Sequence, residues 1–341
     1  MNEKIPVTVL TGYLGAGKTT LLNRILSEGH GQRFAVIVNE FGEIGIDNGL
    51  VIGADEEVFE MNNGCVCCTV RGDLIRIIEG LLKRRSRFDA IIVETTGLAD
   101  PAPVAQTFFA DAAVREAARL DAVVTVADAK FLAERLRDAP EAKTQIAFAD
   151  VIILNKIDLV DAVAIHDTEA RIRAINPYAK LLKASKCAVP LDAILGRNAF
   201  DLERILEIEP GFLDGEGHHD HHGHAGDGHG HAGAAAPLAH HHGEEMQSVS
   251  MSIEGDVHPE KFLPWLQDYI QKEGASILRS KGILSFKDEQ KRFVFQGVHM
   301  LLEGELQREW KPGEKRLSKL VFIGRNLNAE EIRQGFAACK A

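Results

Sequence analysis

A glycine-rich segment near the start of the sequence has the residue types that hold phosphate groups. Residues 12–19 read GYLGAGKT and match the pattern G-x-x-x-x-G-K-[ST], after an apolar β-branched run and before a stretch with helical spacing. Glycines let backbone N–H groups face a phosphate, Lys18 reaches its outer oxygens, and the Thr19 hydroxyl is a ligand for Mg²⁺. The alternative, a glycine-rich turn beside an unrelated lysine, does not explain why an apolar run precedes the motif and a stretch with helical spacing follows it. The predicted phosphate-binding residues are Gly12, Gly15, Ala16, Gly17, Lys18, Thr19 and Thr20.

A second motif has the residues that recognise guanine. Asn155, Lys156 and Asp158 form an N-K-x-D string directly after the apolar run VIIL. A carboxylate at Asp158 accepts hydrogen bonds from N1–H and the exocyclic amine of guanine. Adenine lacks this donor pair, and a buried carboxylate without partners costs on the order of 1–3 kcal/mol. A charged loop that closes a strand is the alternative interpretation. Ser185 follows another short apolar stretch and is predicted to pack beneath the base.

An acidic residue at the end of a third apolar run is a candidate Mg²⁺ ligand. The run AIIVETTG places Glu94 at its carboxyl end, where a carboxylate holds Mg²⁺ directly or through water, and leaves Gly97 free to approach the γ-phosphate. Most P-loop GTPases have Asp at this point, so Glu followed by x-x-Gly indicates a subgroup. An ordinary acid at a strand end is the alternative. Lys18, Thr19 and Glu94 are the predicted catalytic residues of phosphoryl transfer.

Three cysteines are crowded into the segment GCVCC. Neighbouring thiols such as those of Cys65, Cys67 and Cys68 are poor disulfide partners but good soft metal ligands once they are deprotonated. Zn²⁺ takes four tetrahedral ligands, so this cluster needs a further group from elsewhere in the chain. Glu40, which follows the second apolar run, is the preferred oxygen ligand. A redox-sensing thiol pair and buried structural cysteines are the alternatives.

Ten of the fourteen histidines lie between residues 218 and 242. The tract is internal and interrupted by Gly, Ala and Asp, unlike an expression tag. Imidazoles on a flexible chain bind Zn²⁺, Ni²⁺, Cu²⁺ or Co²⁺ weakly, and the ligand types alone do not select one of them. A merely solvated linker is the alternative. The weak metal ligands predicted here are His218, His219, His221, His222, His224, His229, His231, His240, His241 and His242.

The motifs lie on apolar runs that alternate with stretches of helical spacing. The runs are rich in β-branched residues and are predicted to be strands buried on both faces, at 5–10, 34–39, 89–97, 121–129 and 150–156. Predicted helices cover 19–29 and 72–85. This alternation predicts an α/β fold, a P-loop NTPase with a mainly parallel, doubly wound sheet.

Composition divides the chain into three parts. Residues 1–210 are predicted to form the P-loop GTPase domain with the metal-binding cysteines, and 211–245 a His-rich flexible linker. Residues 246–341 are predicted to form a smaller C-terminal α+β domain. In it, strands are expected at 246–253, 277–286, 292–298 and 317–324, and helices at 259–273 and 329–338.

Charge and hydropathy exclude several classes of protein. The net charge of −11, without a basic patch, argues against nucleic-acid and anionic-membrane partners. No stretch has the apolar length of a signal peptide or a membrane span, and five cysteines do not make a disulfide framework. The sequence therefore predicts a cytoplasmic protein, and it leaves a homo-oligomer open.

Taken in order, GYLGAGKTT, VNEFGEIGID, GCVCC, VETTGLADP and NKID resemble the CobW-type metal-chaperone GTPases, relatives of the hydrogenase- and urease-maturation GTPases. LRSKGIL and FQGVHM are similar to the C-terminal domain of that family. The resemblance implies a transition-metal site, for zinc or cobalt, at Glu40, Cys67 and Cys68, with Cys65 as an additional or exchangeable ligand. It also implies a catalytic water near Glu43 or Asp47.

The expected function is that of a GTP-hydrolysing metallochaperone. GTP and Mg²⁺, the latter on Thr19 and Glu94, would control the capture of zinc or cobalt and its transfer to a client metalloprotein. One alternative is a metal store in which the His-rich tract binds most of the metal. The other is a dedicated activator of one cobalt or iron enzyme.

Overall fold

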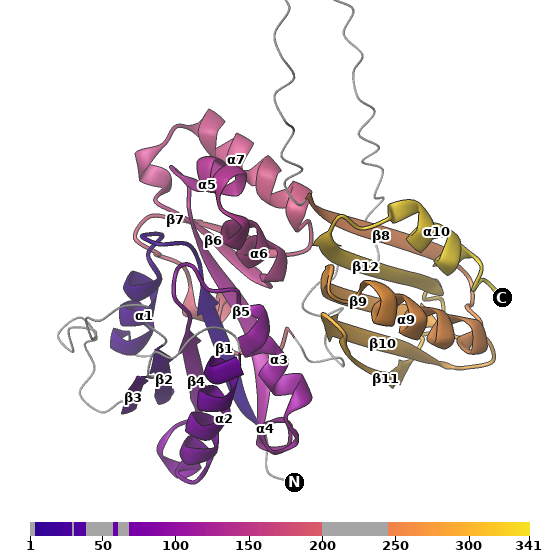
Figure 1. Ribbon diagram of the computed structural model, residues 1–341, viewed down its shortest axis with the longest axis horizontal. Helices are drawn as coiled ribbons and strands as arrows, with labels where there is room; N and C mark the ends of the chain where they lie inside the picture. The colour runs from indigo at the N-terminus through magenta and orange to yellow at the C-terminus, as the bar shows by residue number, and fades with distance from the viewer. Residues whose placement is uncertain (1–3, 29–30, 39–56, 61–67, 200–244) are drawn as a thin grey trace, which may run out of the picture.

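The structure is a computed structural model that describes residues 4–28, 31–38, 57–60, 68–199 and 245–341 (Figure 1). These residues build two β-sheets with helices packed on them. The first sheet lies in the N-terminal part of the chain, and the second lies in the part that begins at Met246.

The first sheet has seven strands in the order β3-β2-β4-β1-β5-β6-β7, and every pairing in it is parallel. Val and Ile fill its central strands, and β2, β4 and β6 are buried along their whole length, as expected for strands covered on both faces. The strands are β1 (Ile5–Thr11), β2 (Phe34–Val38), β3 (Glu57–Glu60), β4 (Ala90–Glu94), β5 (Ala118–Asp128), β6 (Val151–Asn155) and β7 (Lys180–Ala184).

Helices cover both faces of this sheet. The apolar side chains of α1 (Lys18–Ser27) pack with one set of strand residues, such as Leu10 and Ile92. Those of α2 (Cys68–Leu82) pack on the opposite face with Val9 and Ile91. That second layer also contains α3 (Ala102–Ala110), α4 (Ala112–Ala117), α5 (Leu132–Asp138), α6 (Pro140–Phe148) and α7 (Ala162–Ile175). The predicted doubly wound α/β fold is therefore confirmed.

The second sheet is antiparallel, with the strand order β11-β10-β9-β12-β8. Two helices, α9 (Pro259–Glu273) and α10 (Ala329–Ala337), cover one of its faces with an aromatic-rich core around Phe262 (Figure 1). The strands are β8 (Met246–Glu254), β9 (Ile277–Ser285), β10 (Lys291–Val298), β11 (Leu301–Glu309) and β12 (Leu317–Arg325). This is the predicted α+β arrangement.

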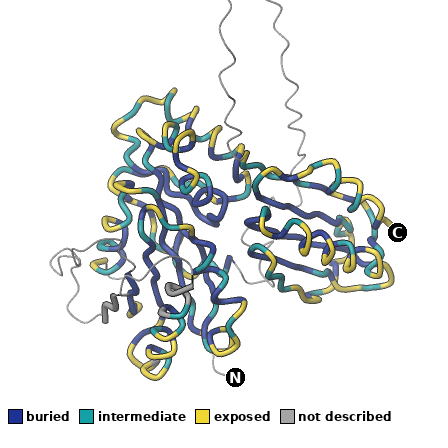
Figure 2. The backbone as a smooth tube through the Cα atoms, in the orientation of Figure 1, coloured by how far each residue is buried: buried dark blue, intermediate teal, exposed yellow. Residues whose placement is uncertain are grey.

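The strands of both sheets form the buried interior of the protein (Figure 2). β9 is buried at every residue, although it contains Arg279 and Lys281. Buried charges need partners, and those of β9 lie in the N-terminal part of the chain. The two sheets are thus joined by polar contacts as well as by apolar packing.

Some elements differ from the sequence prediction. Helix α2 begins at Cys68, four residues before the predicted start at Gly72, and β5 begins at Ala118 instead of Asp121. Strands β3 and β11 were not predicted from the sequence. Both lie at a sheet edge and contain several charged residues, so neither has the continuous apolar run that marked the other strands. None of the helices in the described ranges combines the length and apolar character needed to span a membrane.

Candidate functional site

Four neighbouring strands end in one row at an edge of the parallel sheet. Leu10 of β1 pairs with Glu94 of β4, and Val38 of β2 pairs with both Glu94 and Glu60 of β3. Adjacent strands lie about 4.8 Å apart, so the segments that continue from these residues start side by side. The strand order reverses between β1 and β5 at this edge, which is where ligands of open α/β sheets bind.

The glycine-rich loop after β1 depends on backbone conformations that favour glycine. Gly12, Gly15 and Gly17 have positive φ angles of 139°, 75° and 116°. Space is also restricted at two of them, because a Cβ at Gly12 would lie 2.2 Å from the carbonyl oxygen of Val126, and one at Gly17 would lie 2.6 Å from Nδ2 of Asn155. The loop curls as the motif predicts and leads directly into α1.

Lys18, at the end of this loop, is close enough to Glu94 for their charges to interact. Lys18 Nζ donates to the carbonyl oxygen of Gly12 at 2.8 Å and, more weakly, to that of Tyr13 at 3.5 Å. Burial lowers the pKa of Lys18, and the nearby negative charge of Glu94 partly offsets this. Glu94 itself is 7% exposed. The exposed residues Thr19 and Thr20 follow Lys18 in the first turn of α1.

The loop after Glu94 packs tightly against the glycine-rich loop. Thr95 Oγ1 donates to Thr11 Oγ1 at 2.9 Å and joins the ends of β4 and β1. A Cβ at Gly97 would lie 2.6 Å from the backbone nitrogen of Leu14, so only glycine fits this approach. The structure therefore places Gly97 beside the glycine-rich loop, and its predicted approach to the γ-phosphate stays a prediction.

Asn155 and Lys156 connect the N-K-x-D motif to the glycine-rich loop. Asn155 is 2% exposed, and its Nδ2 donates to the carbonyl oxygen of Ala16 at 2.9 Å. Lys156 Nζ donates to the carbonyl oxygen of Gly15 and to Asp128 Oδ2, each at 2.7 Å. Asp128 was missed by the sequence analysis. Its position at the end of β5, next to Asn155 in the sheet register, is the signal that could have identified it.

The third segment of the site is the turn at residues 185–187. Ser185 is hydrogen-bonded to the carboxylate of Asp158, and this bond is the main reason why the pKa of Asp158 lies below its usual value. The backbone N–H of Cys187 donates to Asn155 Oδ1 at 2.8 Å. Arg24 of α1 donates to the carbonyl oxygen of Cys187 from the other side. The turn is thus held by two distant elements, and Arg24 carries no sequence signal for this role.

Most of the predicted metal ligands, and the two acids predicted to place the attacking water, fall in segments that the structure does not describe. Glu40, Glu43, Asp47, Cys65, Cys67 and the ten histidines of the tract lie outside the described residues, and Cys68 is described only as the first residue of α2. Within the described ranges, no three His, Cys, Asp or Glu side chains are grouped so that they could hold a metal ion. The predicted metal site therefore stays a prediction.

Family models match almost the whole chain. Residues 6–183 match the model of the CobW/HypB/UreG nucleotide-binding domain. The chain belongs to the CobW/HypB/UreG family. Residues 246–340 match a second model, the cobalamin synthesis protein cobW C-terminal domain. The CobW/HypB/UreG match contains the glycine-rich loop, the loop after Glu94 and the N-K-x-D motif, but not the turn at 185–187. The resemblance to this family, drawn from the sequence motifs, is confirmed.

Several curated proteins align with nearly the whole of this CobW-type chain. The zinc chaperone YjiA of Escherichia coli is 32% identical, with 98% of this chain and 99% of YjiA covered. The zinc chaperone CobW of Pseudomonas aeruginosa is 36% identical over 96% of this chain and 90% of its own. The zinc-regulated GTPase metalloprotein activator 1 of Schizosaccharomyces pombe is 33% identical over 96% of this chain and 84% of its own.

Solved structures of the E. coli protein have the same fold. Zn(II)-bound YjiA GTPase aligns over the full length of both chains with a TM-score of 0.75 and 28% identity. A Zn(II)-bound triple mutant of YjiA, in which one glutamate and two cysteines are replaced by alanine, aligns with a TM-score of 0.76. The similarity extends over both sheets of this chain.

Proposed function

We propose that this chain is a GTP-hydrolysing metallochaperone of the cytoplasm that binds a transition metal, zinc first, and transfers it to client metalloproteins under nucleotide control. The observation that carries this proposal is the row formed by Leu10, Glu94, Val38 and Glu60. The phosphate loop and the Mg²⁺ ligand Glu94 start from one half of the row. Glu40 follows Val38 by two residues, and the segment with Cys65 and Cys67 follows Glu60. In this proposal, the nucleotide and the transition metal bind at the same edge of the sheet.

The described side chains fit a GTP site. The N–H groups of the loop and Lys18 hold the phosphates, and Asp158, restrained by Ser185, accepts hydrogen bonds from the guanine edge. Thr19 and Glu94 offer the hard oxygen ligands that Mg²⁺ takes, and Mg²⁺ bound there neutralises charge on the phosphate oxygens. Glu43 or Asp47 positions the attacking water in this proposal.

The names of the relatives support zinc as the cargo. Two are called zinc chaperones and one a zinc-regulated GTPase metalloprotein activator. The residue types replaced in the YjiA triple mutant, one glutamate and two cysteines, are those of the proposed site at Glu40, Cys67 and Cys68. That mutant is still Zn(II)-bound, so a test of the thiolate site must separate it from other zinc sites, including the His-rich tract.

The thiolate site is tested by the absorption of bound Co²⁺. Thiolate-to-Co²⁺ charge transfer gives a near-ultraviolet band that imidazole sites lack. In a chain without residues 217–243, we expect this band with one Co²⁺ per chain, and we expect Cys67→Ser with Cys68→Ser to abolish it. Cys339→Ser is the control, because Cys339 is buried in the C-terminal sheet domain, and it should keep the band. A band that survives the double substitution would refute the assignment.

Nucleotide control is tested by Zn²⁺ titration against a competing chelator in the same shortened chain. We expect the non-hydrolysable GTP analogue to tighten Zn²⁺ binding by about 5- to 150-fold relative to GDP, since a coupling of 1–3 kcal/mol has this size. The physical reason is that an ordered segment after β2 presents Glu40 to the thiolates in advance. Equal Zn²⁺ affinities in the apo, GDP and analogue states would exclude nucleotide control and favour a metal store.

Arg24 gives a test of the base side of the site. Arg24→Met removes the donor to the carbonyl oxygen of Cys187, so the turn that carries Ser185 loses its hydrogen bond from α1. We expect GTP affinity to fall about 3- to 10-fold, because a hydrogen bond of this kind is worth about 1 kcal/mol. The measurement is a titration with a fluorescent GTP analogue.

The control for Arg24 is Glu28→Gln. Glu28 forms an exposed ion pair with Arg24 at 2.6 Å, and its loss leaves the bond to Cys187 in place. This variant should bind GTP as the wild type does. If both variants bind GTP equally well, Arg24 does not position the turn.

A further inference from the structure

Gln145 on α6 is bonded to the loop that follows Glu94. Its side chain is buried, at 1% exposure, and Nε2 donates to the carbonyl oxygens of Gly97 at 3.0 Å and Ala99 at 3.2 Å. Thr125 Oγ1 of β5 donates to the backbone oxygen of Gln145 at 2.9 Å and fixes the helix to the sheet. A buried carbonyl that loses its donor keeps the full desolvation cost. The loop and α6 are therefore expected to move together.

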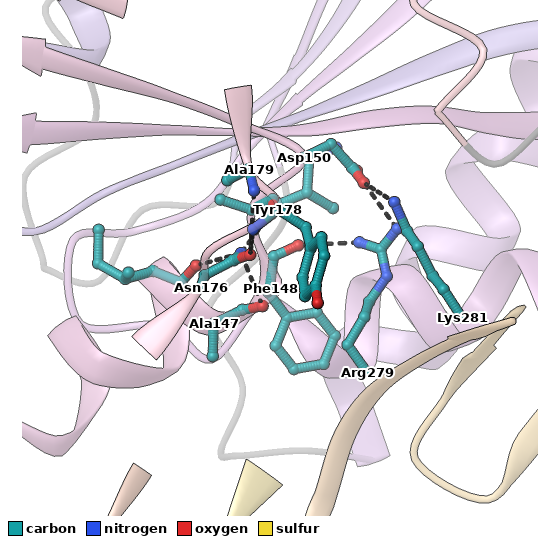
Figure 3. Close-up of polar contacts among 11 residues, drawn as sticks. Ala147, Phe148, Asp150, Asn176, Tyr178, Ala179, Arg279 and Lys281 are labelled. Atoms are coloured by element: carbon teal, nitrogen blue, oxygen red, sulfur yellow. Dashed lines mark hydrogen bonds and ion pairs between the residues drawn. The ribbon is translucent and has the colours of Figure 1, made fainter. Parts of the chain in front are cut away.

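The C-terminal end of the same helix is capped from two directions (Figure 3). Asn176 Nδ2 donates to the carbonyl oxygens of Ile146 and Ala149, each at 2.9 Å, and to that of Ala147 at 3.2 Å. Arg279 of β9 donates to the remaining carbonyl oxygen, that of Phe148, at 2.9 Å. A cation at a helix C-terminus also interacts favourably with the helix dipole. The second sheet thus supplies part of the cap of α6.

Three further contacts attach α6 and the residue that closely follows it, Asp150, to the second sheet. Directly after the helix, Asp150 forms an ion pair with Arg279 at 2.6 Å, and Lys281 Nζ lies 3.5 Å from the same carboxylate (Figure 3). One residue before Gln145, Thr144 Oγ1 accepts from Arg325 of β12 at 3.1 Å. Residues of the second sheet therefore hold α6 on both sides of Gln145.

We propose that Gln145 is a positioning residue that couples the Gly97–Ala99 loop to the C-terminal sheet through α6. This inference rests on the proposed GTPase function, because the γ-phosphate is the group that Gly97 would approach. When the phosphate leaves and the loop moves, the bonds of Gln145 either break at a cost or carry α6 along. Since α6 is packed and capped, its shift is transmitted to Arg279 and Arg325 instead of being absorbed.

The test is hydrogen–deuterium exchange of the full-length protein with GDP and with a non-hydrolysable GTP analogue. In the wild type, peptides spanning 144–150 and 276–285 should exchange about fivefold differently between the two nucleotides, the size of a weak coupling. A peptide from α10 is the internal reference, since this helix lies on the opposite face of the second sheet and reports only global stabilisation. Its exchange should not depend on the nucleotide.

Gln145→Met keeps the volume of the side chain but removes the donor. In this variant the nucleotide-dependent difference at 276–285 should disappear, while the affinities for both nucleotides stay within about threefold of the wild type. A purely structural role would change exchange equally in both nucleotide states. Lys143→Gln, on the same helix, should keep the difference. Thr144→Val removes the acceptor of Arg325 and should reduce the difference, which gives a second test if Gln145→Met does not fold.

The outcomes separate this inference from the proposed function. If both nucleotides bind but exchange at 276–285 is the same in the two states, or if Gln145→Met keeps the difference, the coupling role of Gln145 is wrong and the GTPase function stands. If neither GTP nor GDP binds to the wild type, the proposed function fails and the inference fails with it.

Discussion

Lys18→Ala is expected to lower the rate of GTP hydrolysis by about 100-fold or more. Lys18 Nζ lies 2.8 Å from the carbonyl oxygen of Gly12 in the glycine-rich loop, and in the proposed GTP site its charge would face the β- and γ-phosphates. Removing a single donor to the charge that develops in a transition state costs about 10²–10³ in rate, and here a full positive charge is lost as well. The measurement is phosphate release at saturating GTP.

A matched control is Lys180→Ala. Lys180 is exposed at the amino end of β7, paired with the first residue of β6, and therefore lies at the opposite edge of the sheet. Its loss changes the net charge by the same amount without touching the loop, and GTP hydrolysis should stay at the wild-type rate. If Lys18→Ala hydrolyses GTP as fast as Lys180→Ala, the phosphate-binding role of the loop is wrong.

The parts of the site that were predictable are those whose signal is local. GYLGAGKT favoured positive φ angles at its glycines, the β-branched run before it predicted a buried strand, and the stretch after it predicted a helix, so the position of the loop followed from neighbouring residues. Asn155 illustrates the limit. Its motif was recognisable, but its bond to Ala16, 139 residues away, exists only because β6 lies near β1 in the sheet.

The parts that were not predictable depend on distant partners. Arg24 and Gln145 occur in ordinary amphipathic or apolar stretches, and each acts through backbone carbonyls that sequence patterns do not reveal. β9 was expected as a strand, but nothing in ILRSKGILS shows which residues would pair with its two basic side chains. Arg279 is in fact buried, because Asp150 lies opposite it in another part of the fold. Such pairs become visible only once the two sheets are placed together.

Arg279→Met is expected to destabilise the protein by about 3–5 kcal/mol, the cost of leaving a buried charge without its partner. The side chains of Arg279 and Asp150 are each 3% exposed, so water cannot replace either partner. Asp150 would retain the N–H of Val123 at 2.8 Å and Lys281 at 3.5 Å, which favours the lower end of this range. Chemical denaturation followed by tryptophan fluorescence measures the loss, since Trp265 and Trp310 both lie in the C-terminal part of the chain.

An exposed ion pair separates the effect of burial on stability from the effect of a short ion-pair distance. The exposed pair of Lys315 and Glu254 is as short, at 2.5 Å, yet Lys315→Met should leave the denaturation midpoint unchanged within error, because water solvates both groups.

Combining Arg279→Met with Asp150→Asn should recover much of the stability lost by Arg279→Met, since the amide keeps an acceptor for Val123 and no unpaired carboxylate remains. If the double variant is as unstable as the sum of the two single variants, the two charges do not act as a pair, and the contact between the two sheets does not depend on this ion pair.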